Sequence, residues 1–199
     1  PYPFNGSAQA PTVVVKGGDL VSGDACTVNV TIDAKEGSSL TNSEAVNVGS
    51  YTAKATGLSN NNYKLKDDAV KTADFEITRK GVNPNPDPNS GEGKISITVS
   101  PATAEYDGTD KKSSISVTVK DGEGDGAVTI DPNEYDVVYK NGESEVSSLI
   151  DVADYTIVIQ NKAGKTNGNY DVNGTATFKI TPKEVGLTWT NKTPYTFNL

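Results

Sequence analysis

The sequence predicts an all-β fold made of two tandem β-sandwich modules, with almost no helix. Three observations support this prediction. Apolar and polar residues alternate over several short segments, which is the period of a half-buried strand. Clusters of Gly, Asn and Asp separate these segments and favour turns. The pattern Phe-x-Ile-Thr-x-Lys begins at Phe75 and again at Phe178, so one structural plan is expected to occur twice within the 199 residues.

Composition excludes several classes of partner. Hydrophobic residues make up 34% of the chain, which suits small modules with thin cores. The formal net charge is −8, and no cluster of Lys or Arg interrupts it. A nucleic acid needs a basic surface, so we expect no nucleic-acid partner. Apolar runs are far shorter than the ~20 residues that span a bilayer, so we expect no membrane insertion by this segment.

The first predicted module covers residues 1–80. Alternating segments predict strands near residues 12–16, 26–33, 50–56 and 73–79, and glycine- and asparagine-rich turns separate them. This module begins directly with its Tyr-x-Phe-Asn motif and is predicted to lack its first strand.

Residues 81–93 are predicted to be a linker between the modules. Pro84, Pro86 and Pro88 alternate here with small polar residues. Proline has no amide hydrogen for a β-ladder and favours extended polyproline geometry. The linker is therefore expected to act as a semi-rigid spacer.

The second predicted module covers residues 94–183. Alternating aliphatic and aromatic residues predict strands near residues 94–100, 115–119 and 135–140. Between residues 135–140 and 143–146 lies Asn141-Gly142, which favours a hairpin with a type I′ turn.

Residues 184–199 are predicted to be the opening strand of a following repeat. Val185, Leu187 and Trp189 alternate with small residues, and the Pro-Tyr-x-Phe-Asn motif of the N-terminus recurs after them. We expect residues 185–199 to add to a sheet, either within the second module or by strand exchange with a neighbouring molecule. A chain that starts at Pro1 and contains no Met is expected to be a segment of a longer protein.

The chain resembles the MBG-type immunoglobulin-like repeats of bacterial surface proteins. The residues that carry the resemblance are Tyr135-Asp136-Val137-Val138-Tyr139-Lys140-Asn141-Gly142, Asp154-Tyr155-Thr156-Ile157, Gly168-Asn169-Tyr170 and Phe178-Lys179-Ile180-Thr181-Pro182. The resemblance implies immunoglobulin-like sandwiches, secreted and displayed outside a bacterial cell between a secretion signal and an anchor. It implies structural motif residues and no catalytic ones.

A candidate metal site lies in the insertion that spans residues 121–131. Asp121, Glu123 and Asp125 are spaced like the oxygen ligands of a calcium loop, although no acidic residue occupies the twelfth position. The alternative is a solvated Gly-Asp loop between strands. Beyond this possible Ca²⁺, no cofactor is expected.

A candidate ligand site comprises the aromatic residues near the two termini, which are Tyr2, Phe4, Tyr195 and Phe197. Exposed aromatic rings stack on sugars. The alternative is that these rings close the ends of the cores or the seam between modules.

The expected function is that of a non-catalytic spacer or stalk, which projects other domains from a bacterial cell surface. Its partners are then neighbouring modules of the same chain. The alternative is an adhesion module that binds host glycan or matrix protein through its loops. A second alternative is a weak calcium-binding module. No pair of carboxylates is placed across a cleft by the sequence, so we expect no enzyme.

Overall fold

A computed structural model describes residues 1–16, 18–165 and 168–189. The strands of the smaller of its two sheets are β1 (Tyr2–Pro3), β2 (Val28–Ala34), β3 (Gly49–Leu58) and β4 (Thr72–Thr78). The strands of the larger sheet are β5 (Lys80–Asn83), β6 (Gly93–Ser100), β7 (Thr103–Glu105), β8 (Ser116–Asp121), β9 (Val128–Thr129), β10 (Tyr135–Asn141), β11 (Ser144–Glu145), β12 (Ala153–Asn161) and β13 (Tyr170–Thr181). Two 3-10 turns, η1 (Gly124–Gly126) and η2 (Pro132–Glu134), are the helical elements of the described residues. The all-β prediction is confirmed.

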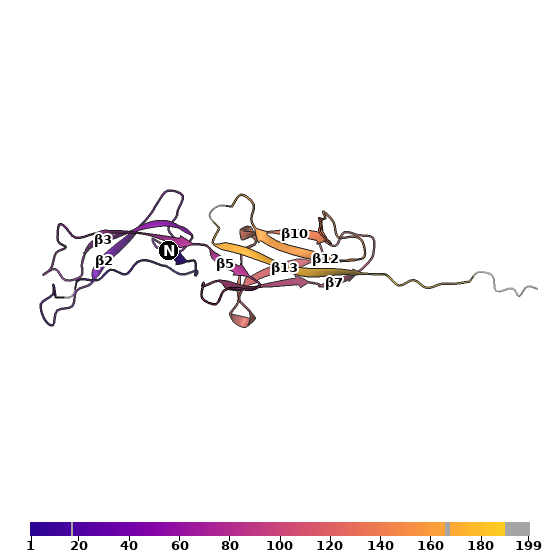
Figure 1. The fold of residues 1–199 in the computed structure, drawn as a ribbon, viewed down its shortest axis with the longest axis horizontal. Coiled ribbons are helices and arrows are strands. Elements are labelled where there is room, and N and C mark those ends of the chain that lie inside the picture. Colours follow the sequence, from indigo (N-terminus) through magenta and orange to yellow (C-terminus); the bar gives the residue numbers. More distant parts are fainter. Residues whose placement is uncertain (17, 166–167, 190–199) are drawn as a thin grey trace, which may run out of the picture.

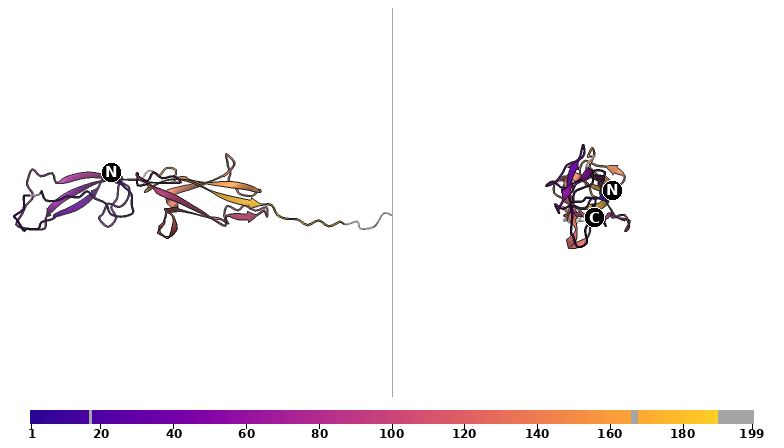
Figure 2. Two further views of the ribbon diagram at one scale, coloured as in Figure 1. Left: turned by 60° about the horizontal axis from the view of Figure 1, so that its bottom comes forward. Right: turned by 90° about the vertical axis from the view of Figure 1, so that its left-hand side faces the viewer.

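The two sheets lie end to end along the longest axis of the molecule (Figure 1). Strand order is β1-β4-β3-β2 in the smaller sheet and β11-β10-β12-β13-β5-β6-β8-β9 in the larger, with β7 pairing β13 outside that order. Seen end-on, the two parts overlap closely, so the molecule is a narrow rod (Figure 2).

The larger sheet folds over on itself to enclose a core, in a sandwich-like arrangement. Ile157 and Ile159 of β12 are fully buried, and Ile95 of β6 and Val119 of β8 belong to the same cluster. Gly174 of β13 lies directly beneath β6, because a Cβ there would come within 2.9 Å of Ile95 Cδ1. β6 and β8 therefore cover the inner face of the strands β10, β12 and β13.

The smaller sheet has a much smaller core. Its buried cluster comprises Phe4, Ala45, Tyr51 and Ile77, and Ala53 of β3 is buried outside that cluster. Within the described residues no strand covers its inner face as β6 and β8 cover that of the larger sheet.

Equivalent hydrogen bonds recur in the two sheets and support the internal repeat. The amide of Phe4 donates to the Thr78 carbonyl at 2.8 Å, and the amide of Tyr106 donates to the Thr181 carbonyl at 2.8 Å. A second pair of equivalent hydrogen bonds is made by two buried tyrosines. Each tyrosine hydroxyl donates to the backbone carbonyl of the residue four positions earlier. These bonds are Tyr51 to Asn47 at 2.7 Å and Tyr155 to Asp151 at 2.9 Å.

The predicted linker needs correction. Lys80–Asn83 forms β5, which pairs in parallel with both β13 and β6 in the larger sheet. The fully buried Val82 explains this placement, since burial of an aliphatic side chain contributes about 1.5–3 kcal/mol. A single residue, Arg79, separates β4 from β5. The proline-rich residues 84–92 are thus a loop within the larger sheet and do not connect the two sheets.

The predicted hairpin is confirmed, but its turn type was wrong. Asn141 pairs with Ser144, so Gly142 and Glu143 form the two-residue loop. In that loop only Gly142 has a positive φ, of 59°. A positive φ at the first loop residue alone corresponds to a type II′ turn, whereas type I′ requires it at both residues.

The predicted strand over residues 12–16 does not form, and neither does a strand over residues 184–189. Val185, Leu187 and Trp189 are at least 81% exposed. Residues 190–199 of the predicted opening strand lie outside the described residues.

Acid is expected to destabilise the fold through carboxylates that hold loops. Two backbone amides, of Leu149 and Lys112, donate to Asp110 and lower its pKa. Hydrogen bonds from Lys111 and Thr109 lower the pKa of Asp107.

A pKa that is lower in the folded state gives stability that is present above the unfolded value, about 3.9, and lost as pH falls through the folded value. We therefore expect the free energy of unfolding to be constant from about pH 7 to 5 and to fall below about pH 4. Urea titrations over this range measure it. In Asp110→Asn, the free energy of unfolding should fall less steeply below about pH 4. A fall as steep as in the unmodified chain would contradict the role of Asp110 in acid destabilisation.

Candidate functional site

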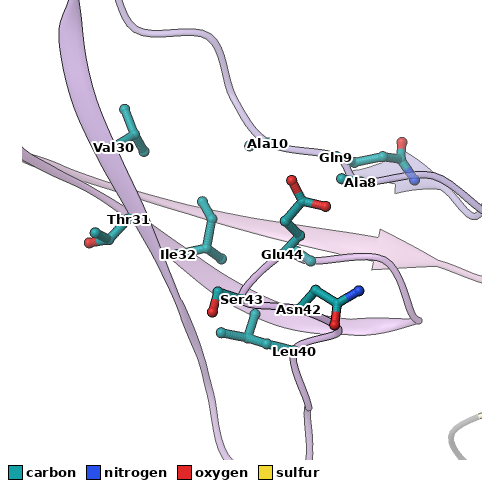
Figure 3. A pocket seen from close by; sticks show the side chains of 11 residues that line it. Ala8, Gln9, Ala10, Val30, Thr31, Ile32, Leu40, Asn42, Ser43 and Glu44 are labelled. Atoms are coloured by element: carbon teal, nitrogen blue, oxygen red, sulfur yellow. The ribbon is translucent and has the colours of Figure 1, made fainter.

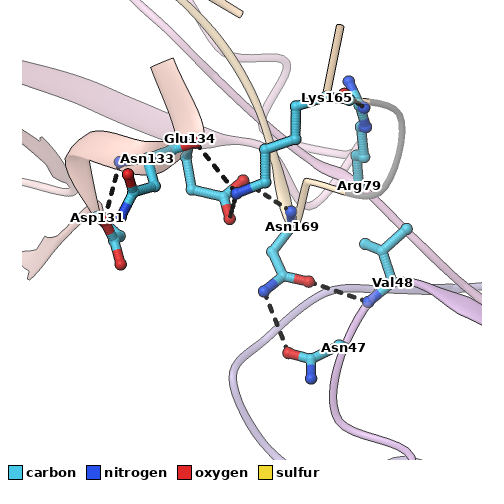
Figure 4. A network of polar contacts seen from close by, with 8 residues as sticks. All are labelled: Asn47, Val48, Arg79, Asp131, Asn133, Glu134, Lys165 and Asn169. Carbon is cyan, nitrogen blue, oxygen red and sulfur yellow. Dashed lines mark hydrogen bonds and ion pairs between the residues drawn. The ribbon is translucent and has the colours of Figure 1, made fainter. Parts of the chain in front are cut away.

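The junction between the two sheets is the most elaborate polar site in the described residues (Figure 4). At its centre is Asn169, the residue before β13. Its Oδ1 accepts a hydrogen bond from the Val48 amide at 3.0 Å, and its Nδ2 donates to Asn47 Oδ1 at 3.2 Å. Both partners lie on the loop before β3, so one side chain of the larger sheet holds a loop of the smaller sheet.

The backbone of Asn169 also makes two hydrogen bonds, one through its amide and one through its carbonyl. Its amide donates to Glu134 Oε2 at 2.9 Å, and its carbonyl accepts from the Lys80 amide at 3.0 Å. Glu134 ends the turn η2, which Asp131 caps by accepting a hydrogen bond from the Asn133 amide. The connection between the sheets and the loop before β13 are thereby tied to one asparagine.

A lysine and an arginine complete the network. Lys165 Nζ lies 2.7 Å from Glu134 Oε1, whose side chain is 10% exposed. Arg79, the residue between β4 and β5, donates to the Lys165 carbonyl at 2.7 Å. The short connection between the sheets is therefore fixed by contacts to the larger sheet.

Aromatic packing reinforces the junction. Phe4 of the smaller sheet packs edge-on against Tyr170, with ring centroids 5.3 Å apart. Tyr170 packs against the buried clusters of both sheets. Burial raises the pKa of Tyr170, with nearby Asp121 and Glu134 adding to the effect. The two cores are thus bridged by one ring.

The predicted ligand-binding aromatics divide into two groups. Phe4 is 8% exposed and sits in the junction, and Tyr2 packs edge-on against Phe75 at 5.8 Å. Neither ring forms a flat exposed platform, and the structure agrees with the alternative that they close a core and a seam. Tyr195 and Phe197 lie outside the described residues.

The predicted metal ligands are not brought together. Asp121 is buried and pairs with Lys80 at 2.6 Å, whereas Glu123 pairs with Lys94 at 3.1 Å. Asp125 lies in the turn η1, which has no buried residue. The described residues contain no group of three or more His, Cys, Asp or Glu that could hold a metal ion. The Asp121 carboxylate points inward because it continues the inward-facing positions of β8.

An open groove of about 670 Å³ lies beside the smaller sheet (Figure 3). Its walls are β2, residues 8–10 and the loop over residues 40–45. Val30 and Ile32 point into it, and Glu44 is the one ionisable side chain of its lining. A single carboxylate among aliphatic and amide groups offers hydrogen bonds and apolar contact but no acid–base pair.

Comparison of the chain with family models, with curated proteins and with solved structures finds no match in any of the three. No helix among residues 1–16, 18–165 and 168–189 is long and apolar enough to cross a membrane. Sequence reasoning offered a seam between modules as an alternative place for Phe4, but it missed the polar network around Asn169. The one available signal was the recurrence of Asn-Tyr at Asn62 and at Asn169.

Proposed function

We propose that the chain is a non-catalytic spacer, made of two tandem immunoglobulin-like modules, from the stalk of an extracellular bacterial surface protein. One observation carries the proposal: two sheets lie end to end, one residue apart, with their cores bridged by Tyr170 and their loops by Asn169. A spacer must keep a constant length. Contacts that hold the two sheets in one orientation keep the length constant. The net charge of −8 supports the proposal, because like-charged rods repel one another.

The stiffness of the junction is tested with spin labels on Cys26, two residues before β2 of the smaller sheet, and on a Glu145→Cys substitution in the larger sheet. We expect a single narrow distance distribution. Asn169→Ala should broaden it, because it removes two hydrogen bonds worth about 0.5–1.5 kcal/mol each. Asn173→Ala, at an exposed asparagine four residues later on β13, is the matched control and should leave the width unchanged.

A broad distribution in the unmodified chain would overturn the spacer proposal. So would an Asn169→Ala distribution as narrow as that of the control.

The groove beside the smaller sheet favours a second candidate, which is adhesion to a host glycan. Gln9, Asn42 and Glu44 supply polar groups next to the aliphatic floor of Val30 and Ile32. A glycan array distinguishes the two candidates. A specific signal that Glu44→Ala abolishes would favour adhesion over the spacer.

A further inference from the structure

Among the described residues, no strand covers the inner face of the smaller sheet as β6 and β8 cover that of the larger sheet, although Ala53 on this face is only 6% exposed. Val30, Ala53 and Ala55 line a largely apolar groove of about 140 Å³ on this face, together with residues 11–13 and 70–73. In the larger sheet the positions equivalent to Ala53 and Ala55 are Ile157 and Ile159, which are buried beneath β6 and β8.

Residues 12–16 are the counterpart of β8 without its partner. Thr-Val-Val-Val-Lys at residues 12–16 matches Ser-Val-Thr-Val-Lys at residues 116–120. β8 forms an antiparallel ladder with β6, whereas residues 12–16 belong to no strand and leave Val13, the counterpart of the inward-facing Val117, 43% exposed. The strand that is missing from the smaller sheet is therefore the equivalent of β6.

The same chain carries an unused copy of that strand. Val185, Leu187 and Trp189 alternate with Gly186 and Thr188. This is the pattern of Ile95, Ile97 and Val99 in β6. All three large side chains of residues 185–189 are exposed, which is unusual for a contiguous apolar segment outside an interface.

We propose that residues 185–189 of one molecule form the missing strand of the smaller sheet in a second copy of the chain. They pair antiparallel with residues 12–16, as β6 pairs with β8. In β6 and β8, Ile97 lies opposite Val119 and Val99 opposite Val117. The equivalent register places Leu187 opposite Val15 and Trp189 opposite Val13.

Side-chain size supports this pairing. The floor of the groove is smaller than in the larger sheet, with Ala53 and Ala55 in place of two isoleucines. The incoming strand is correspondingly larger at one position, with Trp189 in place of Val99, whereas Leu187 equals Ile97 in size. Close packing requires such compensation, because an unfilled space loses dispersion contacts.

Residues 185–189 of the same molecule cannot reach the groove. β13 begins at Tyr170, in the junction, and ends at Thr181. At about 3.3 Å per residue it therefore carries the chain about 36 Å away from the smaller sheet. The four residues from Thr181 to Val185 span about 14 Å at most. The residues that follow β13 leave the molecule at the end opposite to β2 and β3 (Figures 1 and 2). Association is thus head-to-tail, and such a heterologous contact builds open chains of molecules.

Trp189 is the sole tryptophan and reports the contact directly. Over about 1 µM to 1 mM we expect sedimentation velocity to show growing oligomers, and the tryptophan emission to shift to the blue as its 81% exposed ring is buried. Leu187→Asp should weaken association by about 10-fold or more, because it places a carboxylate in an apolar groove. Thr188→Asp is the matched control, since residue 188 faces away from the groove, and should retain association.

A mixing experiment tests the polarity of the contact. Val13→Asp blocks the accepting sheet and leaves the donor segment intact, and Leu187→Asp does the reverse. Each variant alone should remain monomeric, and an equimolar mixture should form dimers and nothing longer. A monomeric unmodified chain with unchanged tryptophan emission would overturn the proposal. So would association that survives Leu187→Asp, or a mixture that forms no dimer.

Discussion

Asp121→Ala is expected to lower the free energy of unfolding of the larger sheet by about 3 kcal/mol. The Asp121 carboxylate lies 2.6 Å from Lys80 Nζ, and the two side chains are 9% and 24% exposed. Removing one partner of a buried ion pair leaves the other charge buried and unpaired, at a cost of about 3–5 kcal/mol. The lower end applies here because a quarter of the lysine side chain still contacts water.

Urea denaturation followed by far-UV circular dichroism measures the loss. Glu123→Ala provides the matched control, since its pair with Lys94 is more than half exposed on both sides and such pairs contribute about 1 kcal/mol or less. Equal losses in the two variants would show that Lys80 is hydrated after the substitution. The ion pair would then not anchor β5 to β8.

Phe178→Ala is expected to destabilise the larger sheet by about 3–5 kcal/mol and to leave the smaller sheet folded. Phe178 is fully buried and faces Tyr155 across the ladder of β12 and β13. Truncating such a ring leaves a cavity that neighbouring side chains fill only partly. The smaller sheet has its own buried cluster, which does not include Phe178.

Amide hydrogen exchange measures both sheets in one experiment. Protection in β10, β12 and β13 should fall steeply in Phe178→Ala, whereas protection in β3 should stay close to that of the unmodified chain. Phe75→Ala, at the equivalent position of the smaller sheet, should give the reverse pattern with a smaller loss, because Phe75 is only partly buried. Simultaneous loss in both sheets would mean that they unfold as one unit and are not separate modules.

Local patterns in the sequence predicted several of the strands that have a partner beside them. Residues 50–56, 94–100 and 135–140 form β3, β6 and β10, and the hairpin of β10 and β11 has its glycine turn. The strands β12 and β13 alternate as well but were not among the predicted strands. Residues 12–16 have an equally good strand composition, but a strand exists only as part of a ladder. Its partner is absent from the described residues of the smaller sheet. The comparison of the two modules had indicated a missing first strand, but the composition of residues 12–16 does not show that they depend on it.

Two errors concerned residues whose surroundings come from distant parts of the chain. Val82 lies just before a proline-rich stretch, yet it pairs with β13 and is fully buried in the core. The acidic spacing that begins at Asp121 resembled a calcium loop, but Asp121 also continues the inward alternation of Val117 and Val119. That alternation was the signal that its side chain faces inward, toward Lys80.

The parallel pairing of first and last strands determines how each sheet would respond to tension. β1 runs alongside β4 from Tyr2 opposite Ile77, and β5 runs alongside β13 from Lys80 opposite Tyr170. Pulling one strand by its start and its parallel neighbour by its end slides the two past each other. The hydrogen bonds between them then bear the load together and do not open one at a time. A rod built this way would unfold abruptly under a high pulling force. The pairing that breaks first would be the two-residue ladder between β1 and β4.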